Sequence, residues 1–288
     1  MSELRQRMIE AMRQRGFSVR THQAYLAAIT ELSRYYRRSP ARLSAEEVKA
    51  YLRHLAVDRE LSASSCRQQL HAARFFYEQV LDRRDMDLKV ALPKQRQRLP
   101  ELLTRAEVSR LLATCTNPKH RTLLATCYGC GLRVSELVAI RVRQDIDGER
   151  GLLRVEQGKG GKDRLVPIGP HLLEALRIYW RHYRPPVWLF CANRSPDRPL
   201  SIATCQRVFQ RVKGKAGIEK VGGIHSLRHA YATHQLQAGV SLQDLQHYLG
   251  HTSLRTTQGY LHWVPDYHEG HHRHDLLAEL PGSGRGAR

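Results

Sequence analysis

Residues 88–100 divide the 288-residue chain into two parts, because the stretch LKVALPKQRQRLP is basic, contains two prolines and has no helical or strand periodicity. Such a composition indicates an extended linker. A chain of this length is expected to form about two domains, each able to bury its own core. We therefore predict one body at residues 1–87, a linker at 88–100, a second body at 101–275 and a flexible tail at 276–288.

The first body has the pattern of a helical bundle. Ser44 and Glu47 form the S-x-x-E signature of a capping box at a helix start. Apolar residues follow at helical spacing, at Val48, Tyr51, Leu52 and Leu55. The same period recurs in SASSCRQQLHAARFFYEQVL and in two earlier stretches, around Met8–Met12 and Tyr25–Tyr36. These stretches predict a unit of four helices.

The second body combines helices with a short hairpin. Thr104 and Glu107 form another capping box, and RTLLATCYGCGL continues as an apolar helix. GLLRVEQ and DRLVPIG alternate like strands on either side of the glycine-rich GKGGK, which predicts a β-hairpin. Further helices are expected in PHLLEALRIYW, IATCQRVFQRV, HSLRHAYATHQLQAG and SLQDLQHYLG. The predicted fold class is mainly α with a small antiparallel β-sheet, an α+β arrangement.

The charge of the chain points to a polyanionic partner. Lys and Arg number 47 against 27 Asp and Glu, which gives a formal net charge of +20. Residues 1–100 carry +9 and the remainder +11, so the excess is spread over both bodies. Arginine far outnumbers lysine, and its guanidinium can donate two hydrogen bonds to one phosphate. We therefore interpret the charge as a sign of a nucleic-acid partner rather than of a basic surface that only confers solubility. The chain has no apolar run near the ~18 residues of a membrane span and no secretory signal, so we expect a cytoplasmic protein.

Neither the cysteines nor the tail histidines have the spacing of a metal site. Cys127 and Cys130 form a C-x-x-C, but no second pair follows, and their apolar surroundings favour core packing. The tail carries four histidines without a cysteine partner, which favours a solvated segment: His268, His271, His272 and His274. We expect no metal and no cofactor.

Four short stretches carry cationic or hydrogen-bonding groups ahead of a tyrosine. They place Arg133 and Glu136 in GLRVSEL, Lys159 in GKGGKDR, His225 and Arg228 in IHSLRH, and His251 in LGH. Tyr260 follows His251 by nine residues. Each group alone has an ordinary structural explanation: an intrahelical salt bridge, a solvated lysine, a surface histidine, a core aromatic. Together they contain what phosphoryl transfer needs.

The chemistry of such a set can be written without a metal. Two arginine forks and a histidine would hold the non-bridging oxygens of a phosphodiester. Surrounding cations would lower the pKa of Tyr260 from about 10 and make its hydroxyl a nucleophile. Lys159, at the tip of the hairpin, would protonate the leaving 5′ oxygen. The sequence has no carboxylate cluster that would hold Mg²⁺, which agrees with a metal-free route.

The chain resembles the tyrosine recombinases, or phage-type integrases, most closely their Xer-like and integron-integrase-like branch. The motifs TRAEV, GLRVSEL, GKGGKDRLVPIG, HSLRHAYATH, LGH and TTQGY occur in the order of that family. The resemblance implies a SAM-like helical core-binding domain followed by a catalytic domain. It implies six catalytic residues, Arg133, Lys159, His225, Arg228, His251 and Tyr260. Glu136 would orient them.

The implied reaction is site-specific strand exchange on double-stranded DNA. Tyr260 would form a 3′-phosphotyrosyl link, which the 5′-hydroxyl of a partner strand then attacks without ATP. Family members act as homotetramers on two synapsed sites and pass through a Holliday junction. They serve mobile genetic elements or chromosome resolution, and some of them act with accessory proteins. The residues do not identify the DNA site or the direction of the reaction.

Two alternatives remain open at this point. The chain could be a type IB topoisomerase-like enzyme that nicks and reseals DNA, or a DNA-binding architectural protein with weak or absent catalysis. One departure from the family is Gly259, directly before Tyr260, where an apolar residue is commoner. Glycine inside a helix costs about 1 kcal/mol and is expected to loosen this segment.

Overall fold

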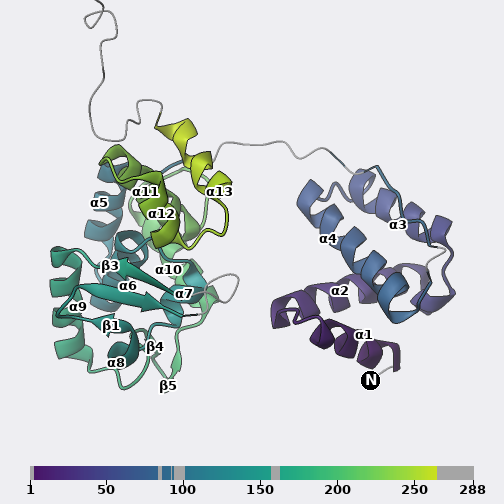
Figure 1. Ribbon diagram of the computed structural model, residues 1–288, viewed down its shortest axis with the longest axis horizontal. Coiled ribbons are helices and arrows are strands. Elements are labelled where there is room, and N and C mark those ends of the chain that lie inside the picture. The colour runs from purple at the N-terminus through teal and green to yellow at the C-terminus, as the bar shows by residue number, and fades with distance from the viewer. Residues whose placement is uncertain (1–2, 84–85, 92, 94–100, 157–162, 265–288) are drawn as a thin grey trace, which may run out of the picture. The chain divides into compact units, whose positions relative to one another are not determined.

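The protein forms two compact units, Met1–Arg98 and Leu99–Arg288, in a computed structural model (Figure 1). The structure describes residues 3–83, 86–91, 93, 101–156 and 163–264. The expectations for Lys159, for most of the linker at 88–100, for the four tail histidines and for the tail at 276–288 therefore concern residues outside the described ranges. No helix in the described ranges is both long and apolar enough to cross a membrane.

The first unit is built from helices, as predicted. They are α1 (Glu3–Gln14), α2 (Val19–Tyr36), α3 (Ala45–Val57) and α4 (Ala63–Arg74), with a 3₁₀ turn η1 (Pro40–Arg42) and a π-helical turn η2 (Phe75–Val80). The Ser44 hydroxyl accepts the Glu47 amide at 3.2 Å and the Glu47 carboxylate accepts the Ser44 amide at 2.8 Å, which confirms the capping box. The apolar faces of the four helices meet in one core that includes Met8, Met12, Leu32, Val48, Leu52, Phe76 and Tyr77.

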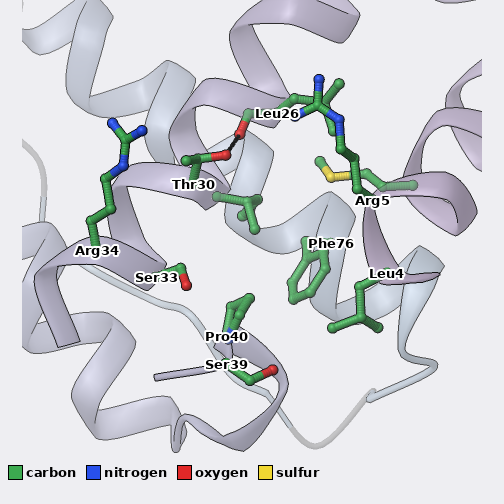
Figure 2. Close-up of a pocket in the computed structure, with 11 residues that line it drawn as sticks. Leu4, Arg5, Leu26, Thr30, Ser33, Arg34, Ser39, Pro40 and Phe76 are labelled. Carbon is green, nitrogen blue, oxygen red and sulfur yellow. Dashed lines mark hydrogen bonds between the residues drawn. The ribbon is translucent and has the colours of Figure 1, made fainter. Parts of the chain in front are cut away.

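A hollow of about 400 Å³ opens in this first unit (Figure 2). Leu26 and Phe76 contribute apolar walls, and Arg5 and Arg34 are its charged groups. The hydroxyl of Thr30 donates to the carbonyl of Leu26 at 2.8 Å, the bond drawn in Figure 2, so it is satisfied within α2. All the residues that line the hollow belong to the first unit.

The second unit is mainly helical as well. Its helices are α5 (Arg105–Thr114), α6 (Pro118–Gly129), α7 (Val134–Val138), α8 (Val142–Asp145), α9 (Pro170–Tyr183), α10 (Ile202–Lys215), α11 (His225–Gln237), α12 (Leu242–Leu249), α13 (Leu254–Gln258) and the 3₁₀ turn η3 (Gly259–Trp263). The capping box of Thr104 and Glu107 is present at the start of α5. Cys127 and Cys130 are buried, unpaired and part of the core, as the sequence indicated.

A small antiparallel sheet stands beside these helices. Its strands are β1 (Ile146–Asp147), β2 (Leu152–Val155) and β3 (Arg164–Pro167), in the order β1-β2-β3. The predicted hairpin is the pair β2 and β3, in which Val155 lies opposite Arg164 and Leu153 opposite Val166. A second hairpin pairs β4 (Cys191–Ala192) with β5 (Ser195–Pro199). β1 and β4 are too short to show alternation in the sequence, so they were not anticipated.

The elements that carry the candidate residues pack on one another. α12 contacts β3 (Figure 1). The turn η3 contacts both α11 and α13. A separate apolar cluster joins these segments and consists of Tyr231, Ala232, Leu236, Leu245, Leu249, Tyr260 and Val264. Residues that are far apart in the sequence are thereby brought together in the second unit.

Candidate active site

Arg133 and Glu136 are fixed to each other at the start of α7. Arg133 is the N-cap residue, and the Glu136 carboxylate accepts its backbone amide at 2.8 Å and its guanidinium at 2.7 Å. The Arg133 side chain keeps about a fifth of its surface exposed, whereas the Glu136 side chain is 6% exposed. Glu136 therefore holds Arg133 from the interior side, while part of the Arg133 side chain remains exposed.

A second arginine, Arg164 on β3, binds the same carboxylate. It donates to the two Glu136 oxygens at 3.0 and 2.8 Å and, through Nε, to the carbonyl of Tyr248 at 2.8 Å. Burial acts to raise the pKa of Glu136, but the bonds and charge of Arg164, joined by the bonds from Arg133, lower it to about 2. Glu136 is therefore ionised at neutral pH, and through Arg164 it connects α7 to β3 and to the end of α12.

Arg228 is the most deeply buried charge of the site, at 1% exposure. Its guanidinium donates to the carbonyls of Gly131 at 2.7 Å and Leu249 at 2.6 Å, and it lies 3.8 Å from the Glu136 carboxylate. Burial and then repulsion by Arg133 lower its pKa to about 10, so it is still a cation at neutral pH. Gly131 has a φ of +59°, and a Cβ there would lie 2.3 Å from the Tyr231 ring, so only glycine fits.

His251 is held at both ring nitrogens. Nε2 lies 3.2 Å from the Arg228 guanidinium, and Nδ1 lies 2.9 Å from the Thr257 hydroxyl. An arginine can only donate, so Nε2 of His251 accepts a hydrogen bond from Arg228. Nδ1 then carries the ring proton and donates a hydrogen bond to the Thr257 hydroxyl. Burial, and then the charges of Arg228, Arg133 and Arg164, lower the pKa of His251 to about 4. The ring is therefore neutral at physiological pH.

Tyr260 lies on η3 and is 7% exposed. Its ring stacks beside the His251 ring, with centroids 6.3 Å apart and planes 9° apart. Its hydroxyl lies 3.0 Å from Nδ1 of His229. Tyr260 thus belongs to the apolar cluster through its ring and to the polar cluster through its hydroxyl.

The expected effect of the cations on Tyr260 was wrong in its net direction. Arg228 and Arg133 do act to lower the pKa of Tyr260, but burial is the larger influence and raises it above its ordinary value. Without a ligand the hydroxyl is therefore fully protonated at neutral pH. A phenolate does not form in advance.

Contacts join six of the seven residues that the sequence singled out. His225 begins α11, and its ring centroid lies 5.0 Å from that of His229, which bonds Tyr260. From Tyr260 the contacts continue through His251, Arg228 and Glu136 to Arg133. Lys159, the seventh, lies outside the described residues, between the described ends of β2 and β3.

Two further residues of the cluster, Arg164 and His229, were not anticipated. Cross-strand partners share a face of a sheet, so the register of the hairpin sends Arg164 inward with Val155. His229 follows His225 by one helical turn, the spacing that places two side chains on one face. The signals were therefore an arginine at an inward strand position and a second histidine in HSLRH.

The electrostatic character of the site favours an anion. Three arginines, Arg133, Arg164 and Arg228, surround one carboxylate, so positive charge is in excess. Arg133 has the most exposed side chain of the three. Within the ranges that the structure describes, no three His, Cys, Asp or Glu side chains gather as metal ligands. The donor set instead suits phosphate oxygens beside the Tyr260 hydroxyl.

Comparison with known proteins gives one consistent result. Residues 101–265 match the phage integrase family, and residues 4–86 match the N-terminal SAM-like domain of phage integrases. A putative integrase/recombinase of Sinorhizobium fredii, y4qK, is 40% identical over 91% of this chain and 84% of its own. The tyrosine recombinase XerD of Shewanella oneidensis is 32% identical over 90% and 92%.

A solved structure shares the fold. The Tn1549 transposon integrase, in complex with circular intermediate DNA, superposes with a TM-score of 0.73 at 18% identity, over 89% of this chain and 94% of that one. The mainly helical α+β fold with a SAM-like first domain, expected from the sequence, is thereby confirmed.

Proposed function

The chain belongs to the phage integrase family, and on that premise we propose that it is a site-specific DNA recombinase whose nucleophile is Tyr260. The observation that carries the proposal is the buried Tyr260, whose hydroxyl bonds a histidine and whose pKa is influenced by the charges of Arg228 and Arg133. A hydroxyl so placed serves a reaction with a phosphodiester better than it serves packing. The relative named XerD and the solved DNA complex of the Tn1549 integrase support the same chemistry.

The arginines would bind the scissile phosphate. Arg133 has the most exposed side chain of the three arginines, and Glu136 holds its guanidinium in place, so it would bind a non-bridging oxygen directly. Arg228 supplies a fixed positive charge that cannot relax into solvent. Charge develops on those oxygens during transfer, and cations already in position stabilise it most. His251, fixed between Arg228 and Thr257, and His225 at the start of α11 complete the binding groups.

The bond changes follow from this placement. Tyr260 attacks the phosphorus and forms a 3′-phosphotyrosyl ester, and the 5′ oxygen leaves. Lys159 is proposed as the acid that protonates that oxygen, since it lies in the glycine-rich connection between β2 and β3. Attack by the 5′-hydroxyl of a second strand reverses the step. The bond energy is conserved in the ester, so no ATP is needed.

Exchange between two sites needs more than one active site. We propose a homotetramer on two synapsed duplexes in the cytoplasm, with a Holliday junction as intermediate. The positive charge carried by both units suits this use of double-stranded DNA.

A nicked suicide duplex, drawn from DNA that flanks the protein's own gene, tests the proposal. The protein and duplex are mixed in EDTA and quenched in SDS. A protein–DNA adduct that survives SDS and is lost in Tyr260→Phe supports covalent recombinase chemistry. Tight binding with no adduct would refute it in favour of an architectural protein. Relaxation of any supercoiled plasmid, without exchange between two sites, would favour a topoisomerase.

A further inference from the structure

We propose that His229 is a catalytic residue of this reaction: its Nδ1 accepts the proton that the Tyr260 hydroxyl loses during attack on the phosphate. The inference rests on the proposed function and deepens it. Its direct observation is the hydrogen bond of 3.0 Å between His229 Nδ1 and the Tyr260 hydroxyl. The two rings lie 5.7 Å apart at 51°, so the nitrogen, and not the ring face, meets the oxygen.

The other histidines of the site are not placed for this task. His251 uses Nε2 for Arg228 and Nδ1 for Thr257, so neither nitrogen is available to the tyrosine although the rings stack. His225 contacts the ring of His229, edge to face at 5.0 Å. In the described part of the chain, His229 is thus the histidine whose nitrogen meets the nucleophilic oxygen.

The fold holds this pair in place from both sides. His229 lies within α11, where the Thr233 hydroxyl donates to its backbone carbonyl at 2.9 Å. Tyr260 is anchored by the apolar cluster on which η3 packs. A contact between a helix interior and a buried turn has few ways to rearrange. Such a fixed contact is what proton transfer to a positioned base requires.

Both partners are neutral before the reaction. Burial, and then the charges of His225 and Arg228, lower the pKa of His229 to about 4, while burial raises that of Tyr260. Those two neighbours on α11, with Tyr260 on η3, are the titratable and charged groups acting on His229. With its proton on Nε2, the ring accepts from the phenol at Nδ1.

The proton moves as the new bond forms. As the tyrosine oxygen bonds to phosphorus its O–H bond breaks, the proton passes to Nδ1, and the bond from phosphorus to the 5′ oxygen breaks. The 5′ oxygen keeps that electron pair and is protonated by Lys159 in the proposed mechanism. The bound phosphate also offsets the charge of Arg228, which disfavours an imidazolium at His229. In the rejoining step the imidazolium returns its proton to the departing tyrosine oxygen, which restores the starting state.

Two substitutions separate a base from a structural contact. His229→Asn keeps an amide oxygen near the place of Nδ1 but cannot take a proton, and His229→Ala removes both features. The matched control is His234→Asn, since His234 lies on the same helix and makes a comparable bond of 2.9 Å to the Tyr128 hydroxyl, outside the site. The full-length proteins are compared by the single-turnover rate of adduct formation on the suicide duplex, from pH 6.5 to pH 9.5.

The expected result is a rate at pH 7 about 100-fold lower in both His229 variants, with His234→Asn near wild type. The deficit should shrink as pH rises, because the phenol then ionises without help. A deficit equal at every pH would indicate a structural contact and overturn the proposal. An unchanged rate in the His229 variants would also overturn the proposal. A faster rate would mean that His229 restrains Tyr260, which also overturns it.

A substrate with sulfur in place of the 5′ bridging oxygen separates the two proton transfers. A thiolate leaves without protonation, so this substrate should rescue a variant that lacks the acid and leave the His229 variants slow. Rescue of His229→Asn would assign the residue to the leaving group and refute its role as base. If the wild-type protein formed no adduct on the unmodified suicide duplex, the proposed recombinase function itself would be refuted.

Discussion

Replacing Glu136 by glutamine removes one negative charge from the buried cluster and changes almost nothing in shape. Arg133, Arg164 and Arg228 would then face one another without a counter-ion. The pKa of Glu136 is lowered from 4.5 to about 2, and each pKa unit corresponds to about 1.4 kcal/mol, so the carboxylate stabilises the second unit by about 3 kcal/mol at neutral pH.

The stabilisation has a defined pH window. A lowered carboxylate pKa stabilises the fold fully above the ordinary value, and that stability is lost as pH falls through the folded-state value. The difference in unfolding free energy between wild type and Glu136→Gln should therefore be about 3 kcal/mol at pH 7 and shrink between about pH 5 and pH 2.

Tryptophan fluorescence during urea unfolding measures this difference. The three tryptophans, Trp180, Trp188 and Trp263, all lie in the second unit, so the signal reports on that unit within the full chain. Glu174→Gln is the matched control, because Glu174 forms an ion pair with Arg181 at a half-exposed position on α9. Such an exposed pair contributes less than about 1 kcal/mol to the free energy of unfolding. A Glu136→Gln cost under about 1 kcal/mol, or one that stays constant with pH, would refute the reasoning.

Four further predictions concern the same unit and the charge of the chain. Gly131→Ala should destabilise the second unit by more than about 2 kcal/mol in urea unfolding, because of its left-handed backbone and the Tyr231 ring. Gly259→Ala should be neutral or stabilise it by up to about 1 kcal/mol, since φ is −54° and the space is open; a large loss there would contradict the backbone described. Arg228→Lys should slow adduct formation at least about 100-fold in the single-turnover assay, because a single ammonium cannot replace the fork that reaches Gly131, Leu249 and His251; a wild-type rate would contradict its role. DNA affinity, followed by fluorescence anisotropy, should fall by about a thousandfold between 50 and 200 mM salt, and salt-independent binding would exclude phosphate contacts as its source.

Local signals in the sequence were sufficient for most of the fold. The capping boxes at Ser44 and Thr104 mark helix starts, and both are present. The glycine-rich GKGGK between alternating stretches identified the hairpin of β2 and β3. These features depend on residues near one another in the chain, so they can be recognised without knowledge of tertiary contacts.

Other features depend on contacts between distant segments. Arg164 reaches Glu136 and Tyr248 only when the register of the hairpin turns it inward. His229 meets Tyr260 across 31 positions of sequence. The pKa of Tyr260 is decided by burial against the fields of two arginines, and the amount of burial is not visible in a string of residues.

The identity of the nucleophile is tested most directly on the adduct itself. The protein–DNA adduct is digested with protease and nuclease, and the modified peptide is sequenced by mass spectrometry. A nucleotide joined through its 3′-phosphate to Tyr260 is the result that this account predicts. The same modification on another residue, such as Tyr248 or Tyr231, would contradict it.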